Sequence, residues 1–304
     1  MAPTHAAAQK QAQKQIDAWV KRGNMNEMLI LNFPGLEELP PLPPTVKSLV
    51  LQDMPKLRTI HPLPPTLEYL CLMRCTNIPI EDFLSLPPTL VSIELNNIPS
   101  AHDLSILPRN LLHLNLLNMV CETIPEFPSL THLHLESNTN ITQLRTPDTL
   151  RKLTVMKCPL LHTLEISSNI RYLQLWHLPS LRELPPWPPA IQELNIQHIP
   201  LTEVPPFPRA SNIFAVVCDT NLPEELMKYK HPKYGVHIEE TEDWIERINP
   251  TLHEMQSKKR IQKRCAEYAQ ELRLSALSPH RVEKWLGEGS DSQWELLDMM
   301  LGVE

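Results

Sequence analysis

The sequence predicts an α/β solenoid of about ten leucine-rich repeats, a horseshoe with parallel strands along its concave side. The first observation is the pattern L-x-x-L-x-L, which begins at Val46 with Leu49 and Leu51 and returns at Leu67 as LEYLCL. A fixed period near 20 residues marks repeats of this kind. The second is the phrase PLPPT before both copies. The third is a composition of 32 prolines and only 6 glycines, with the prolines in phase with the repeat.

Residues 1–24 are predicted to form a helical cap on the first repeat. The segment AAAQKQAQKQIDAWVKR is rich in strong helix formers. Ile16, Trp19 and Val20 fall on one face of that helix by the i, i+3, i+4 rule. A terminal repeat would otherwise leave its apolar end in water, which favours a cap. A targeting helix is the alternative interpretation.

Residues 25–222 are predicted to hold the repeats. Their first residues are Met25, Val46, Leu67, Leu90, Leu111, Leu130, Leu150, Ile170, Ile191 and Ile213. Because side chains alternate along a strand, the fourth and sixth positions point into the core, and the third, fifth and seventh face outward on the concave side. Segments such as ELPPLPPT cannot be helical, because proline lacks the N–H donor. The convex side is therefore predicted to be extended and polyproline-like.

The ninth position, often asparagine in this class of repeat, is unusual here. Most units have an apolar residue or cysteine at this place: Phe33, Met54, Cys75, Ile98, Met119 and Cys158. Asn138 and Asn221 keep the amide. Something other than a continuous asparagine ladder must therefore satisfy the backbone of the turn.

Residues 223–304 are predicted to be a C-terminal helical region. Apolar spacing and capping residues indicate about four helices, of which the longest spans roughly 250–274 and opens at Pro250. These helices either cover the open end of the solenoid or form a small module beside it. The basic run KKRIQKR at 258–264 is either a solvated helix face, with acidic residues a turn away, or a nucleic-acid or nuclear-import patch.

Composition limits the classes of partner. The net charge of −7 argues against a general nucleic-acid binder. No apolar run approaches the length of a membrane span, and the N-terminus lacks the apolar core of a secretory signal. The 6 cysteines show no paired spacing, so we expect free thiols in a reducing, cytoplasmic compartment. We expect a monomer with a protein partner and no cofactor, nucleic acid or membrane.

Two segments resemble the LP-x-LP-x-x-L-x-x-L-x-V repeats of bacterial leucine-rich effectors delivered by type III secretion. They are LPPLPPTVKSLVL at 39–51 and WPPAIQELNI at 187–196, and the resemblance covers about residues 15–222. It implies the solenoid fold and the binding of a host protein. Some members carry a C-terminal ubiquitin-ligase domain with a nucleophilic cysteine near an acidic residue. The tail here is too short for that domain, and the sole near match is Cys218-Asp219, with Cys218 predicted to point inward.

The tail resembles a second group. The segment IQKRCAEYAQELRLSALSPHRVEKWLGEG at 261–289 is similar to a C-terminal signature of proteins from giant nucleocytoplasmic DNA viruses. The matching residues are Arg264, Cys265, Tyr268, Glu271, Leu272, Arg281, Val282, Trp285 and Leu286. This resemblance implies a location in an infected cell's cytoplasm or in a virion.

Candidate binding residues gather on the concave face of the later repeats. They share an outward strand position and a basic, amide or aromatic side chain: His113, His132, His134, Lys152, Tyr172, Gln174 and Trp176. An outward tryptophan beside tyrosine and basic groups is typical of an interface hot spot. The three histidines are also close enough to be considered for zinc, but no fourth ligand completes a site. The earlier repeats are expected to present small or acidic groups: Glu27, Ser48, Ser92 and Glu94, besides Tyr69.

The sequence therefore predicts a non-enzymatic scaffold that binds protein through the concave face, in a viral or effector protein that engages a host protein. No phosphate-binding loop, metalloprotease motif or zinc-spaced Cys-x-x-Cys pair appears. Two alternatives stay open. One is a degenerate ubiquitin-ligase effector, and the other is a structural component of a virion.

Overall fold

The computed structural model describes residues 4–24, 26–201, 205, 214–218, 236–238 and 263, with the backbone alone for 214–218 and 236–238. The chain divides into two compact units, residues 1–251 and 252–304. The description below concerns the first unit. The predicted C-terminal helices and Asn221 lie outside the described residues.

The N-terminal cap is confirmed as helix α1, His5–Arg22. Its buried stripe consists of Ala8, Ala12, Ile16 and Trp19. Val20, predicted to share that face, is 51% exposed, because the stripe follows the two alanines instead. The Trp19 Nε1–H donates to the backbone carbonyl of Glu27 at 3.0 Å, which ties the helix to the entry of the first strand.

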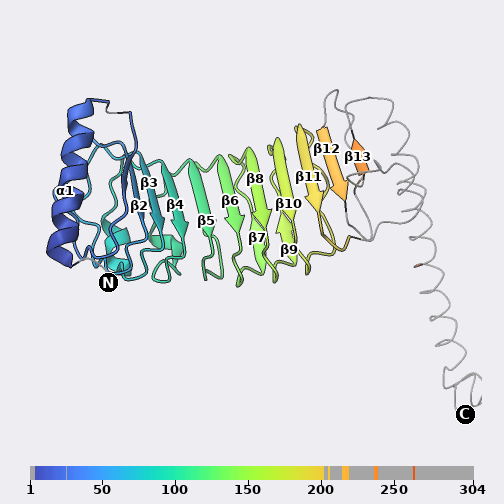
Figure 1. The fold of residues 1–304 in the computed structure, drawn as a ribbon. Coiled ribbons are helices and arrows are strands. Elements are labelled where there is room, and N and C mark those ends of the chain that lie inside the picture. The colour runs from blue at the N-terminus through green and yellow to red at the C-terminus, as the bar shows by residue number, and fades with distance from the viewer. Residues whose placement is uncertain are drawn as a thin grey trace, which may run out of the picture. The chain divides into compact units, whose positions relative to one another are not determined.

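Ten parallel strands form the sheet within the described residues, as predicted (Figure 1). In spatial order they are β1 (Leu29–Leu31), β2 (Ser48–Gln52), β3 (Tyr69–Met73), β4 (Ser92–Asn96), β5 (His113–Leu117), β6 (His132–Glu136), β8 (Lys152–Met156), β10 (Tyr172–Trp176), β11 (Glu193–Gln197) and β12 (Phe214–Cys218). An eleventh strand, β13 (Val236–Ile238), pairs antiparallel with β12 and was not predicted. In the repeats from β2 to β11, the first, fourth and sixth residues form the buried core.

The first repeat begins one residue later than predicted. Leu29 pairs with Leu49, so Leu29 holds the fourth position and the repeat begins at Asn26, not Met25. Leu29 and Leu31 are buried, whereas Ile30 is 44% exposed. The prediction failed because the run MLIL offers apolar residues to both faces. A one-residue slip then exchanges the inward and outward sets.

The tenth repeat begins one residue earlier than predicted, for the same reason. Leu194 pairs with Ala215 and Ile196 with Val217, so the repeat begins at Asn212 rather than Ile213. The run IFAVVC is apolar throughout and does not fix the register. Cys218 therefore aligns with Gln197 at the seventh position, and not at the inward sixth position that the sequence predicted.

The convex side is mostly extended, as predicted, with ordered exceptions where prolines are absent. Two 3-10 helices, η1 (Ile80–Ser85) and η2 (Leu104–Ile106), replace the proline-rich strip in two repeats. Strand β7 (Gln143–Arg145) pairs in parallel with β9 (Thr163–Glu165) in two later ones. Proline cannot donate a ladder hydrogen bond, so only proline-free segments pair in this way.

The last residue of PLPPT joins neighbouring repeats. The Thr66 hydroxyl donates to the carbonyl of Pro44 in the preceding repeat, at 2.6 Å, and to that of Val46, the first residue of its own repeat, at 2.9 Å. Thr89 makes the same two bonds one repeat later. Asn110 makes them in the next with its amide. The hydroxyl at the end of the phrase thus satisfies carbonyls in a segment where proline leaves few backbone N–H donors.

The residue after each strand resolves the question of the missing asparagine ladder. The eighth residue has a positive φ of 52–56° in eight successive repeats: Asp53, Arg74, Asn97, Asn118, Ser137, Lys157, His177 and His198. In the seven repeats from that of Asp53 to that of His177, its N–H donates to the carbonyl of the seventh residue in the next repeat, as from Asp53 to Met73 at 2.9 Å. A ladder of backbone hydrogen bonds therefore joins the turns of successive repeats, where the sequence required something other than a continuous asparagine ladder.

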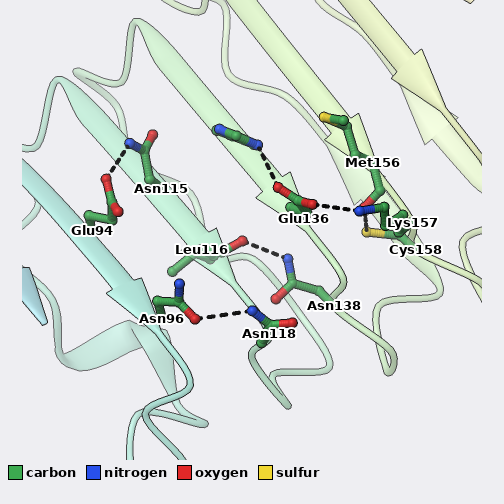
Figure 2. Close-up of polar contacts among 11 residues, drawn as sticks. Glu94, Asn96, Asn115, Leu116, Asn118, Glu136, Asn138, Met156, Lys157 and Cys158 are labelled. Atoms are coloured by element: carbon green, nitrogen blue, oxygen red, sulfur yellow. Dashed lines mark hydrogen bonds and ion pairs between the residues drawn. The ribbon is translucent and has the colours of Figure 1, made fainter. Parts of the chain in front are cut away.

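Asn138 keeps the amide at the ninth position, and it is fully buried. Its Nδ2 donates to the Leu116 carbonyl at 2.9 Å (Figure 2). Its Oδ1 accepts from the Met119 N–H at 3.0 Å. Cys75 holds the same position in an earlier repeat, where its thiol lies 3.5 Å from the Leu51 carbonyl. The thiol is a longer and weaker substitute for the amide.

No helix among the described residues is long and apolar enough to cross a membrane.

Candidate functional site

The third-position side chains form a row on the concave face, and they become exposed at the fifth repeat. Ser48, Tyr69 and Ser92 are half-buried. The next members of the row are exposed: His113, His132, Lys152, Tyr172 and Glu193. Their strands pair in register, so successive members stand about 4.8 Å apart. Four of the seven predicted site residues therefore lie in one continuous exposed row.

The three predicted histidines do not form a metal site. The rings of His113 and His132 meet edge to face, with centroids 4.5 Å apart. His134 lies two residues along β6, and its Nε2 is buried without a hydrogen-bond partner among the described residues. Glu136 Oε2 is 3.9 Å from this nitrogen, which is too long for a hydrogen bond. No group of three or more His, Cys, Asp or Glu residues in the described ranges is placed to hold a metal ion.

Burial lowers the pKa of His132 and of His134 below the ordinary value of 6.5. For His132, the neighbouring His113 and Lys152 lower the pKa further. For His134, Glu136 and Glu94 oppose the effect of burial without cancelling it. Both imidazoles are therefore mainly neutral at pH 7, and each offers one donor and one acceptor nitrogen.

Trp176 lies at the other margin of the face, at the seventh position of its repeat. Its ring is the centre of a cluster that the sequence interpretation missed. The Lys157 ammonium lies 5.1 Å from the ring centroid, and the His177 and His198 rings lie 6.4 and 6.1 Å from it. Lys157 also contacts Glu136 Oε1 at 2.9 Å (Figure 2). We call Trp176, Lys157, His177 and His198 the tryptophan cluster.

Fifth-position side chains line the middle of the concave face, between the third-position row and the tryptophan cluster; we call the whole of this surface from β5 to β10 the concave strip. Gln174, a predicted site residue, is half-buried and pairs in register with Thr154 and Asn195 on its two sides. Asn115 donates to Glu94 at 3.2 Å across β4 and β5 (Figure 2). These short polar groups form a floor between the exposed third-position row and the tryptophan cluster.

The first half of the concave face differs from the prediction. Glu27, predicted to be outward, occupies the second position because of the shifted register, and its carboxylate pairs with Arg22 at 3.1 Å. Met28 and Ile30 take the outward places and are 42% and 44% exposed. This end of the face is therefore more apolar than predicted.

The four cysteines whose side chains are described are unpaired and buried: Cys71, Cys75, Cys121 and Cys158. Burial raises the pKa of the Cys71 thiol to about 12, and the nearby Glu94 carboxylate contributes to the rise. Burial also raises the pKa values of the other three to about 11. A thiol with so high a pKa holds almost no thiolate at neutral pH, so none of the four is suited to nucleophilic catalysis.

Comparison with known proteins finds the same architecture. No protein-family profile and no curated protein sequence match the chain. Among solved structures, YopM, a leucine-rich effector protein from Yersinia pestis, is similar with 25% identity and a TM-score of 0.50, over 72% of this chain and 67% of that one. CroV588, a giant-virus protein with a circular leucine-rich repeat structure, is similar with 17% identity and a TM-score of 0.39. That match covers 65% of this chain and 32% of CroV588.

YopM from Yersinia enterocolitica is also similar, with 20% identity and a TM-score of 0.31, over 70% of this chain and 60% of that one. The chain thus spans about two thirds or less of each of these proteins. YopM from Yersinia pestis is a leucine-rich effector, the group whose repeats residues 15–222 resemble. The chain is a leucine-rich repeat solenoid similar to effector and viral members of that class.

Proposed function

We propose that the solenoid is a non-enzymatic scaffold that binds a protein, such as a host protein in the cytoplasm, through the later half of its concave face. The observation that carries this proposal is the exposed strip from β5 to β10, with the third-position row on one margin and the tryptophan cluster on the other. The residues proposed to contact the partner are His113, His132, His134, Lys152, Tyr172, Gln174 and Trp176.

Three features support this assignment. Tyr172 is 41% exposed in the row, and Trp176 stands between a lysine and two histidines. Tryptophan, tyrosine and arginine carry much of the binding energy in measured interfaces. The strip is rigid, because every strand is hydrogen-bonded on both sides, and a preformed surface loses little entropy on binding. The likeness to the leucine-rich effector YopM agrees with a role in binding a foreign protein.

The test compares capture of partners from host-cell lysate by the wild-type chain, by Trp176→Ala and by Met28→Ala. Met28 is a matched control, because it is an exposed apolar side chain on the same face at the far end of the sheet. A partner should be retained by wild type and Met28→Ala and lost by Trp176→Ala. With that partner purified, Trp176→Ala should weaken binding about thirtyfold, the effect of losing a 2 kcal/mol hot spot. Equal binding by all three, at equal helix and sheet content, would contradict the proposal.

The absence of catalysis needs its own test at Cys218, since the pair Cys218-Asp219 is the one that suggested a ligase. Wild-type protein incubated with a charged ubiquitin conjugate should give no adduct that a reductant releases. The control is Cys218→Ser, which should behave identically. A reducible adduct in the wild type that Cys218→Ser lacks would show that the chain is an enzyme.

A further inference from the structure

Three cations without an ion pair lie close together beside the third-position row, whereas Lys56, Arg109 and Arg182, which also form no ion pair within the described residues, lie in three different repeats. Lys47 pairs with Glu68 at 2.8 Å, and Arg58 pairs with Glu37 at 3.6 Å, each on a neighbouring repeat. By contrast, Arg151, Lys152 and Arg171 form no ion pair with any residue that the structure describes. The sequence interpretation included Lys152 alone, because the two arginines precede their strands.

The backbone holds these three residues together. The Arg151 and Lys152 N–H groups both donate to the Thr131 carbonyl, and the Arg171 and Tyr172 N–H groups both donate to the Arg151 carbonyl. Each second-position residue therefore stacks on the one in the next repeat, about 4.8 Å away. The Arg151 guanidinium is further fixed by a 3.2 Å bond to the Asp148 carbonyl.

His113 and His132 continue this margin to the fifth repeat, where their rings meet edge to face and His132 pairs in register with Lys152. Burial, together with Lys152 and His113 beside it, lowers the pKa of His132, so this imidazole adds hydrogen-bonding nitrogens rather than a positive charge at pH 7. We call Arg151, Lys152, Arg171, His113 and His132 the basic rim. In a chain whose net charge is −7, the three cations of this rim, gathered at one margin without an ion pair, indicate an anionic ligand.

We propose that the basic rim binds an acidic, extended segment of a protein partner, laid across the repeats from β5 to β10. This inference rests on the proposed function and names the chemistry of its partner. The rim crosses about three intervals of 4.8 Å, or roughly 14 Å, which an extended chain covers with about four residues. A short run of Asp or Glu therefore matches the length of the rim.

A nucleic acid fits the surroundings less well. Carboxylates occupy the same face around the rim, at Glu94 in the floor, at Glu136 beside the tryptophan cluster and at Glu193 in the next strand. A duplex carries a charge about every 1.7 Å and binds by neutralising many phosphates at once. Three fixed cations bordered by carboxylates offer too few contacts for that mode.

The experiment titrates the full chain with a fluorescein-labelled peptide of about eight residues that alternates Glu and Ser, followed by fluorescence anisotropy at low and moderate salt. A peptide with Gln in place of Glu and a single-stranded oligothymidylate of similar length are the other probes. The acidic peptide should bind, more weakly as salt rises, and the Gln peptide should not. The triple variant Arg151→Gln, Lys152→Gln, Arg171→Gln should bind the acidic peptide at least about tenfold more weakly.

The matched control is Lys47→Gln, Arg58→Gln, Arg74→Gln, which removes the same charge from three ion-paired positions in the early repeats. It should bind like the wild type. Equal loss in the control, no binding of the acidic peptide, or equally tight binding of the oligonucleotide would each overturn the proposal. Trp176→Ala should not affect this titration. Failure of the Trp176→Ala capture experiment alone would therefore count against the proposed function, and failure of the titration alone against the acidic ligand.

Discussion

The buried amide of Asn138 should carry a large share of the stability of the sixth repeat. The substitution Asn138→Leu keeps the shape of the side chain but removes both of its hydrogen bonds, to Leu116 O and from Met119 N. Both backbone partners belong to fully or almost fully buried residues. An unsatisfied buried group costs about 1–3 kcal/mol, so the free energy of unfolding should fall by about 2–5 kcal/mol.

Urea unfolding followed by circular dichroism measures this loss, with the slope of the transition as a check that the folded state is unchanged. Asn138→Cys should lose less than Asn138→Leu, because Cys75 shows that a thiol there reaches a carbonyl of the preceding repeat. The control is Asn140→Leu, since Asn140 is exposed and its two hydrogen bonds, donated to Val120 O at 3.4 Å and accepted from the Thr139 hydroxyl at 3.1 Å, lie at the surface; it should change stability by less than about 0.5 kcal/mol. Other repeats have Met or Ile at the ninth position, so the competing expectation is that an apolar residue is harmless in the sixth repeat as well. An Asn138→Leu variant whose free energy of unfolding lies within about 0.5 kcal/mol of the wild-type value would support that expectation and refute the reasoning.

Three further predictions concern thiols, protonation and register. Native protein at pH 7.5 should leave its four buried thiols unalkylated, and denatured protein without reductant should take up six adducts; a missing pair would indicate a disulfide. Because the folded state lowers the pKa of His132 and His134 below 6.5, the unfolded chain binds protons first. The contribution of these two groups to the free energy of unfolding should therefore be fully present above about pH 6.5 and be lost as the pH falls below it. The loss of stability with falling pH should be less steep in the His132→Gln, His134→Gln variant. An unchanged dependence on pH would show that these two histidines do not cause it. Finally, the register of the first repeat can be tested by urea unfolding. Leu31→Thr should lower the free energy of unfolding by about 2 kcal/mol or more, because Leu31 is buried, and exposed Ile30→Thr should lower it by less than about 1 kcal/mol. The reverse order would support the register that the sequence predicted, with Ile30 inward.

The sequence predicts the interior of the array because its strands mix apolar and polar residues. In LEYLCL or LLHLNL, a slip of one residue would bury Tyr69 or His113 and expose leucines, so a single register is acceptable. The end repeats lack that constraint, since MLIL and IFAVVC are apolar on both faces. Their register is set by what they pack against, α1 at one end and β11 at the other, and those contacts are not local in sequence.

The sequence located the candidate residues that lie within strands and missed those that lie just outside them. Alternation along a strand places the third, fifth and seventh residues, and it located His113, Lys152 and Trp176. It says nothing about residues outside the strand. Lys157 and His177 follow their strands in the left-handed conformation, and Arg151 precedes its strand. The sequence did offer one signal for the turn, a polar residue at the eighth position of every repeat from Asp53 onward. The direction in which that side chain points depends on the positive φ of its backbone, which no local sequence pattern requires.

The basic rim and the tryptophan cluster, on opposite margins of the concave face, should contribute to binding in different ways. The third and seventh positions of a strand are four residues apart, which separates the basic rim from the tryptophan cluster by about 13 Å. Exposed cations act at long range and raise the rate of association, with a strong dependence on salt. A partly buried ring such as Trp176 acts after contact, by excluding water, and so lowers the rate of dissociation. A partner that uses the whole strip must therefore carry acidic groups on one side and an apolar surface on the other. Its association rate should respond to substitutions in the rim, and its residence time to those in the cluster.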